Sequence, residues 1–303
     1  MFTRITTDLM NNNLLDALNQ TQQSQNAALT QVETQKRVNV PSDDPAAAAL
    51  FSANQAQGTQ VTQYLQNINS LNGELQTGDA ALASAVTMMN RAVTLGTSGA
   101  TGTLSGTDMQ ALGQEVGQIQ QQMVSVANAT FQGTYVFGGT AAGPAYLLDS
   151  TQPDGVRYQG NATVNQVEVA PGAMTNVNLP GTQVFQNGSG SVFQALNDLK
   201  TALDSGNHAG AQTAVAEVSS ALSQLNQQRV FYGTTLDRLN ITQNFLNNEQ
   251  LSLTAQQNTL TGADLASSIT ELSSAETARS AILAAGSRIS QLSLLNFPNT
   301  MGG

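Results

Sequence analysis

The residues that could take part in catalysis or metal binding are few and poorly placed for it. The only histidine, His208, follows a Ser-Gly-Asn turn, and the chain has no cysteine. A metal site built from nitrogen and sulfur ligands needs several such residues, and a serine nucleophile needs a base beside it. We therefore predict no metal site, no cofactor and no enzymatic activity, and we expect His208 to be a solvated loop residue.

Two adjacent carboxylates, Asp43 and Asp44, are the next candidates, because paired carboxylates can carry acid–base chemistry or bind a cation. They stand directly before Pro45 and an alanine-rich run. This order is typical of a helix N-terminus, where an aspartate caps free N–H groups and its charge is favourable. The sequence therefore favours a capping role, with either aspartate as the cap. The glycines at 102–106 and 138–139 lack the lysine and the strand–loop–helix context of a phosphate loop.

Composition excludes further classes. The chain has 303 residues, only 10% of them charged, and a net charge of −10. Nucleic-acid binding depends on Lys and Arg displacing counterions, so a nucleic-acid partner is not expected. No stretch reaches the roughly 18 to 20 apolar residues of a membrane span, and residues 1–13 lack the apolar core of a signal peptide. We expect a subunit that packs against others and, if it is exported, leaves the cell without signal cleavage.

The two ends of the chain carry apolar residues at helical spacing. From Gly262 to Asn296 the gaps are three or four residues, and residues 2–32 show a weaker stripe of the same kind. Each stripe needs a covering helix, so we expect the two ends to lie side by side as a coiled coil. The predicted assembly seam consists of Ile5, Leu9, Leu14, Leu18, Leu265, Ile269, Leu272, Ile282, Ile289 and Leu292.

Between the ends, the pattern predicts helices on both sides of a β-rich insert. A helix from Pro45 continues through a stripe at 61–93, and a loop is expected at Gly96–Gly106 with Ser105 or Thr107 capping the next helix. A strand or hairpin is predicted at 131–140, strands at 156–159, 164–169 and 174–179, and helices at 192–203 and from about 208 to Thr261. Gly262 is the expected joint before the last helix.

The predicted fold is mainly α with a β insert, arranged as a nested helical hairpin. Residues 1–42 and 262–303 would form terminal coiled-coil segments, residues 43–140 and 190–261 a helical bundle, and residues 141–189 a small β-rich domain. The terminal stripes are rich in Ala, Asn and Gln, so they bury little apolar area against an ordering cost of about 1–2 kcal/mol per residue. We expect them to be largely disordered in the free subunit and to fold when many copies pack.

Several segments resemble the bacterial flagellin family. Residues 37–47, with Asn39, Asp43, Asp44 and Pro45, are similar to that family's N-terminal segment. Residues 132–139, with Tyr135, Phe137 and Gly138, resemble its hook-associated protein 3 branch, as do residues 177–185 and 264–295. Residues 296–303 depart from the pattern, because they extend past the usual Leu-Leu finish.

The resemblance implies a flagellin-like structural protein at the junction between hook and filament. It implies export through the flagellar type III apparatus without signal cleavage, an export chaperone on the C-terminal helix, and an extracellular location. The implied neighbours are hook-associated protein 1, flagellin and further copies of the chain in a ring. Two alternatives stay open: filament flagellin itself, and a type III secreted helical translocator that acts on membranes.

Overall fold

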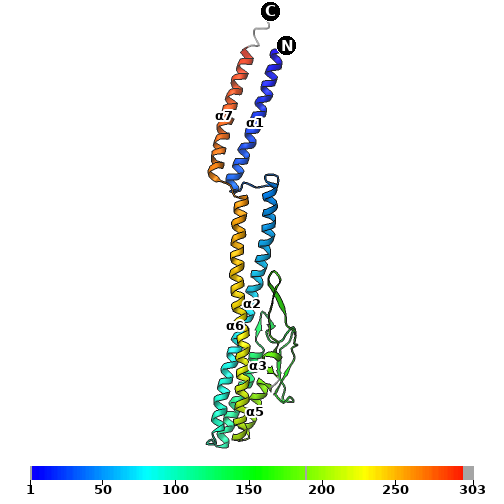
Figure 1. Cartoon of the computed structure of the whole chain (residues 1–303), viewed down its shortest axis with the longest axis vertical. Coiled ribbons are helices and arrows are strands. Elements are labelled where there is room, and N and C mark those ends of the chain that lie inside the picture. The colour runs from blue at the N-terminus through cyan, green and yellow to red at the C-terminus, as the bar shows by residue number, and fades with distance from the viewer. Residues whose placement is uncertain (1, 188–189, 296–303) are drawn as a thin grey trace, which may run out of the picture. The chain divides into compact units, whose positions relative to one another are not determined.

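A computed structural model describes residues 2–187 and 190–295, and most of them are helical (Figure 1). The fold class predicted from the sequence, mainly α with a β insert, is confirmed. The predicted tail at 296–303 lies outside the described residues. Two compact units are present, one from Met1–Thr59 and Gln250–Gly303 and the other from Gln60–Glu249. The described helices are α1 (Phe2–Thr34), α2 (Pro45–Ala100), α3 (Gly106–Ala127), α4 (Gly181–Val184), α5 (Val192–Asp204), α6 (His208–Thr261) and α7 (Leu265–Leu295).

In the first unit, α1 and α7 lie side by side and antiparallel (Figure 1). Gly286 packs against Leu14, and Ser268 donates a hydrogen bond to the Gln31 side chain at 3.0 Å. Later residues of α1 therefore meet earlier residues of α7, as the pairing of the chain ends predicted. The buried residues at their contact include the small side chains Ala28 and Ala275, so the two backbones approach closely.

Helix α1 ends at Thr34, where the next residue leaves the helical conformation. Gln35 adopts a left-handed conformation with φ of 57°. Its carbonyl accepts a hydrogen bond from the Ala263 N–H at 3.0 Å. The turn at Gln35 thus redirects the chain so that it pairs with the segment leaving α6.

In the second unit, α2, α3, α5 and α6 form a helical bundle whose apolar faces meet. Its fully buried side chains include Ile68, Leu75, Leu82, Met89, Met109, Met123, Leu196, Leu199, Leu225 and Tyr232. Ile68, Leu75, Leu82 and Met89 belong to the stripe predicted at 61–93, so that part of the prediction is confirmed.

The predicted loop start at Gly96 is wrong, because α2 continues to Ala100. A Cβ at Gly96 would stand 2.5 Å from Val215 and 2.9 Å from Leu199. The glycine therefore serves close packing inside a helix rather than ending it. The following helix begins as expected, with the Ser105 hydroxyl accepting a hydrogen bond from the Asp108 N–H at 3.2 Å.

The described strands form four separate two-stranded antiparallel sheets. The predicted strands at 156–159, 164–169 and 174–179 correspond to β4 (Val156–Tyr158), β5 (Gln166–Ala170) and β6 (Ala173–Asn176), and the hairpin after Thr130 is β1 (Thr130–Phe131) with β2 (Thr134–Tyr135). The partner of β4, β3 (Tyr146–Leu148), was not predicted, nor was the pair β7 (Gln186–Asn187) and β8 (Gly190–Ser191).

An aromatic cluster joins the insert to α5. Phe137, Tyr146, Phe185 and Phe193 are fully buried. The Phe137 and Phe185 rings meet edge to face with centroids 5.2 Å apart, and Tyr146 lies 4.8 Å from Phe193. These separations are in the range at which aromatic pairs add to the free energy of burial. The insert is therefore anchored by side chains from just before it, from near its start and from near its end.

Candidate assembly site in the terminal helices

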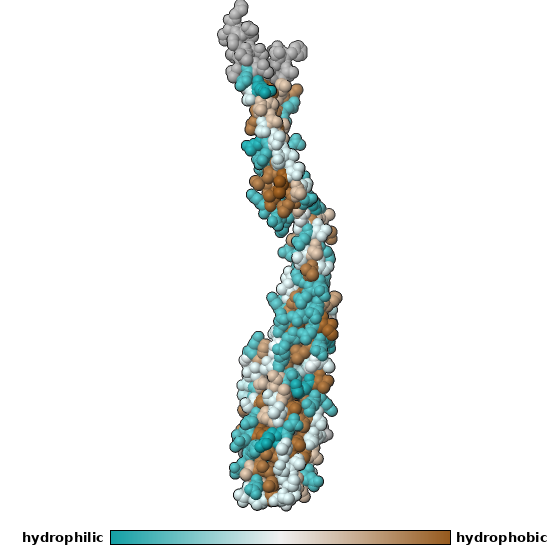
Figure 2. All heavy atoms as spheres, turned by 90° about the vertical axis from the view of Figure 1, so that its left-hand side faces the viewer, coloured by the Kyte–Doolittle hydropathy of each residue, from teal (hydrophilic) through white to brown (hydrophobic). Residues whose placement is uncertain are grey.

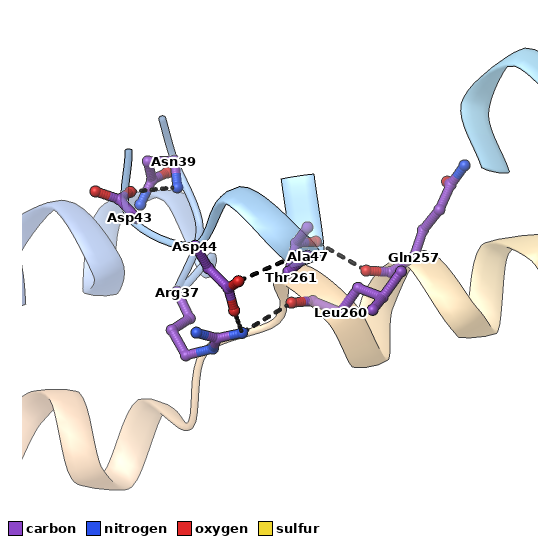
Figure 3. A network of polar contacts seen from close by, with 8 residues as sticks. All are labelled: Arg37, Asn39, Asp43, Asp44, Ala47, Gln257, Leu260 and Thr261. Atoms are coloured by element: carbon purple, nitrogen blue, oxygen red, sulfur yellow. Dashed lines mark hydrogen bonds and ion pairs between the residues drawn. The ribbon is translucent and has the colours of Figure 1, made fainter. Parts of the chain in front are cut away.

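The segments between α1 and α2 and between α6 and α7 meet through backbone hydrogen bonds. The Arg37 N–H donates to the Thr261 carbonyl at 2.7 Å, and Lys36 forms a bridge with Gly262. The Arg37 guanidinium adds a hydrogen bond to the Leu260 carbonyl at 3.2 Å, so it reaches the last free carbonyls of α6 (Figure 3). A cation near a helix C-terminus is favourable. We call this region, residues 35–47 with 257–263, the polar joint.

The two aspartates of the polar joint have separate structural roles. One Asp44 oxygen accepts a hydrogen bond from the Ala47 N–H at 3.0 Å, and the other accepts one from Arg37 at 3.1 Å (Figure 3). Asp43 instead accepts hydrogen bonds from the N–H groups of Asn39 and Val40, at 2.9 and 3.0 Å. Asp44 is therefore the cap of α2, and Asp43 stabilises the preceding turn. The capping interpretation is confirmed.

These hydrogen bonds hold both aspartates in their charged form. The Val40 and Asn39 N–H groups lower the pKa of Asp43 below its ordinary value. For Asp44 the Ala47 N–H, followed by the Arg37 side chain, lowers the pKa. A carboxylate held charged by hydrogen bonds and a cation is a poor proton acceptor near neutral pH, so the pair suits a structural role. The sequence analysis did not predict a role for Arg37. Its position seven residues before Asp44 was the one sequence feature that could have indicated the ion pair.

The predicted seam residues occupy two kinds of environment. Leu14, Leu18, Leu272, Ile282 and Ile289 are half-buried, whereas Leu9, Leu265 and Ile269 are exposed. The side chains of Ile5 and Leu292 lie outside the described residues. The terminal pair therefore covers part of the predicted seam and leaves another part open to solvent.

Large apolar side chains are exposed on the helix pair α1 and α7, which we call the terminal pair. Figure 2 shows hydrophobic surface on the visible face of this pair. These residues include Leu15 and Leu29 of α1 and Leu265, Ile269 and Leu283 of α7. The pair also carries an open groove of about 980 Å³, lined largely by Ala, Ser and Thr. Exposed apolar surface of this kind marks interaction sites in soluble proteins.

The segment with Tyr135, Phe137 and Gly138 lies in the interior of the second unit. Phe137 and Gly138 are buried, and Tyr135 is half-buried in β2. The Gly138 carbonyl accepts a hydrogen bond from the Asn161 N–H at 3.1 Å. These residues hold the insert together.

Other candidate chemistry finds little support. Across the described residues, no group of three or more His, Asp or Glu side chains is placed to hold a metal ion. His208 differs from its prediction: it is half-buried at the start of α6, with Nδ1 2.7 Å from the Gly99 carbonyl oxygen. None of the described helices is both long and apolar enough to cross a membrane.

Comparison with solved structures supports the fold. A flagellar hook-associated protein from Vibrio parahaemolyticus superposes with a TM-score of 0.67 at 20% identity, covering 72% of this chain and 99% of that one. The flagellar junction protein FlgL from Legionella pneumophila gives a TM-score of 0.60 at 15% identity, covering 70% and 100%. FlgL from Bacillus cereus gives 0.57 at 19% identity, covering 69% and 99%.

Sequence comparison identifies the family. Flagellin from Listeria monocytogenes is 22% identical over 272 residues, which is 89% of each chain. The family model of the bacterial flagellin N-terminal helical region matches residues 5–142, and that of the C-terminal helical region matches residues 215–297. Both ends of the chain, and most of its length, are thereby covered, and the chain belongs to the bacterial flagellin family.

Proposed function

We propose that this chain is the structural subunit of the hook–filament junction, joining hook-associated protein 1 to flagellin and adapting the hook to the filament. The main support is the terminal pair, which leaves large apolar side chains of α1 and α7 exposed in the single chain. A subunit that packs among neighbours would cover them. Two of the matching solved structures are described as a hook-associated protein and as a flagellar junction protein, which favours the junction over other positions in the flagellum.

The three parts of the chain have different roles in this proposal. We infer that residues 1–42 and 262–303 are assembly segments, that residues 43–140 and 190–261 form a supporting bundle, and that residues 141–189 form an outer β-rich domain. The assembly segments become ordered only among neighbouring copies, since their mutual contact includes small residues such as Ala28 and Ala275. Hydrogen exchange on the isolated monomer tests this ordering. Strong protection at residues 5–35 and 265–292 would contradict it.

Export precedes assembly in this proposal. The subunit leaves through the flagellar type III apparatus without loss of a signal peptide, and a dedicated chaperone holds the α7 segment until then. The exposed Leu265, Ile269 and Leu283 are apolar contacts that such a chaperone would cover. Mass spectrometry of the chain recovered from flagella checks the first point, because an intact N-terminus is expected.

A deletion strain provides the decisive experiment. Without the junction subunit, electron microscopy should reveal hooks that lack filaments, and flagellin should accumulate in the medium. Complementation with the wild-type chain should restore filaments. Normal filaments in the deletion strain would overturn the proposed function.

Filament flagellin is a second candidate, favoured by the flagellins of two Listeria species, each aligned over 89% of this chain. Copy number separates the two functions. A junction subunit should be a minor component of isolated flagella, whereas an amount equal to the main filament band would identify the chain as flagellin. A membrane-acting translocator is the remaining alternative, and binding of the purified chain to liposomes would favour it.

A further inference from the structure

A groove between α5 and α6 combines acidic side chains with small apolar ones. Its volume is about 340 Å³, and every residue of its lining belongs to the second unit. Gln194 and Asp198 come from α5, whereas Thr213, Glu217 and Ser220 come from α6. Among the described residues that line it, none is Lys, Arg or His. We call this surface the acidic groove.

The two carboxylates of the acidic groove have no cationic partner. Within residues 2–187 and 190–295, neither Asp198 nor Glu217 forms an ion pair or accepts a hydrogen bond. The one lysine of α5, Lys200, is instead paired with Asp204. Two like charges that share a groove repel each other, and a cation bound between them removes that repulsion. The groove therefore attracts positive charge.

A buried amide oxygen supplies a third acceptor. Gln224 lines the groove and is 7% exposed. Its Nε2 donates hydrogen bonds to the Val184 and Gln186 carbonyls, at 3.1 and 3.0 Å. No described group donates to its Oε1, and the planar amide directs that oxygen away from the two carbonyls, toward the groove. Because a buried oxygen without a donor is costly, an N–H group of a ligand is favourable at this point.

Apolar side chains lie among these acceptors. Ala195, Ala216 and Ala221 line the same groove. On α6, Glu217 lies about two turns before Gln224, so the acceptors follow one another along the groove. A metal ion needs several ligands at one point, and the described residues place no group of three or more His, Asp or Glu side chains for it. An aliphatic polyamine instead alternates ammonium groups with methylene segments.

We propose that the acidic groove binds a small aliphatic polyamine. Asp198 holds one ammonium group, Glu217 holds a second, and the Gln224 Oε1 accepts a hydrogen bond from a third. The methylene segments between them pack on the alanines of the lining. The bound ligand connects α5 with α6 and, through Gln224, with the end of the β insert. This inference goes beyond the junction function and does not depend on it.

Isothermal titration calorimetry of the full-length chain with spermidine, an aliphatic triamine, tests the site. Asp198→Asn and Glu217→Gln should each weaken binding by about tenfold, because each removes a charge-assisted hydrogen bond. Asp237→Asn removes the same charge from an exposed position of α6 outside the groove, so it is the matched control. Binding to this control variant should equal binding to the wild type.

Three further arms identify the ligand chemistry and the place of binding. Butylamine carries a single ammonium group and should bind at least about tenfold more weakly than spermidine. Mg²⁺ should not displace spermidine, because it requires an octahedral set of oxygen ligands. Ala216→Lys places an ammonium group of the chain itself in the groove. This variant should lose spermidine binding while circular dichroism retains its helix content.

The contradicting outcomes are distinct. Equal losses in Asp237→Asn and in the two groove variants would show that spermidine responds to net charge alone. Displacement by Mg²⁺ would assign the groove to a metal ion, and unchanged binding to folded Ala216→Lys would place the ligand elsewhere. Each of these results, like the absence of binding to the wild type, overturns the polyamine site. The deletion strain tests the junction function separately, so the two failures are distinguishable.

Discussion

The Arg37 guanidinium donates a hydrogen bond to the Asp44 carboxylate at 3.1 Å, linking the segment before α2 to the cap of that helix. The two side chains are 49% and 30% exposed, and ion pairs in such surroundings contribute little to stability. The ion pair matters because of where it lies, since the Arg37 guanidinium also donates a hydrogen bond to the Leu260 carbonyl. One arginine thus connects the start of α2 with the end of α6.

The cap should matter more than the ion pair. Asp44→Ala removes the acceptor of the Ala47 N–H and should lower the free energy of unfolding by about 1 kcal/mol. Asp44→Asn should cost less, because asparagine also caps helices. Urea unfolding followed by circular dichroism measures both. Equal losses for the two variants would indicate that charge, rather than capping, dominates at this position.

Acid should weaken the polar joint. The pKa values of Asp43 and Asp44 are lowered below the ordinary value of 3.8 in the folded chain, so folding favours their charged forms. Their stabilising contribution is complete above that ordinary value and is lost as the pH falls through the folded-state pKa values. The Asp43→Asn, Asp44→Asn double variant should lose less stability than the wild type between pH 5 and about pH 2. Urea unfolding at each pH measures the free energy of unfolding of both proteins. If it falls by the same amount in the wild type and in the double variant, the two aspartates make no such contribution.

Two helical glycines should respond to alanine in opposite directions. A Cβ at Gly78 would lie 2.5 Å from the Tyr232 ring, whereas nothing stands within 4 Å of a Cβ at Gly233. Gly233→Ala should stabilise the chain by up to about 1 kcal/mol through helix propensity. Gly78→Ala should destabilise it by about 1–3 kcal/mol, because Tyr232 is buried and must move. Urea unfolding of both variants measures the difference, and stabilisation by Gly78→Ala would show that the ring moves freely.

A charge within the terminal pair should block assembly while the bundle stays folded. Leu272 and Ile282 are half-buried on α7, and an aspartate at either position would bring an unpaired charge into the contact. Leu272→Asp or Ile282→Asp should leave the midpoint of thermal unfolding of the bundle unchanged but yield hooks without filaments. Ser280→Asp, at an exposed α7 position, is the matched control and should support filaments. Filaments built with the Leu272→Asp chain would remove the predicted seam from the assembly surface.

Helix periodicity and turn residues were sufficient to predict the order of the main elements. Asp43-Asp44-Pro45 marked the start of α2, and Ser105 marked the start of α3. The strand β3 was not predicted; it pairs with β4, and Tyr146 at its start is part of the aromatic cluster, a long-range contact that local sequence patterns do not specify. Glycine misled at Gly96, since the sequence cannot distinguish a helix end from a close helix contact.

The sequence by itself determined that the two chain ends are helical and weakly apolar, because spacing of three or four residues places side chains on one face of a helix. Only the tertiary structure decided which edge of that face is covered. The antiparallel contact of α1 with α7 half-buries Leu272 and Ile282 but leaves Leu265 and Ile269 exposed. Periodicity specifies a shared face, whereas burial depends on where the second helix lies across it.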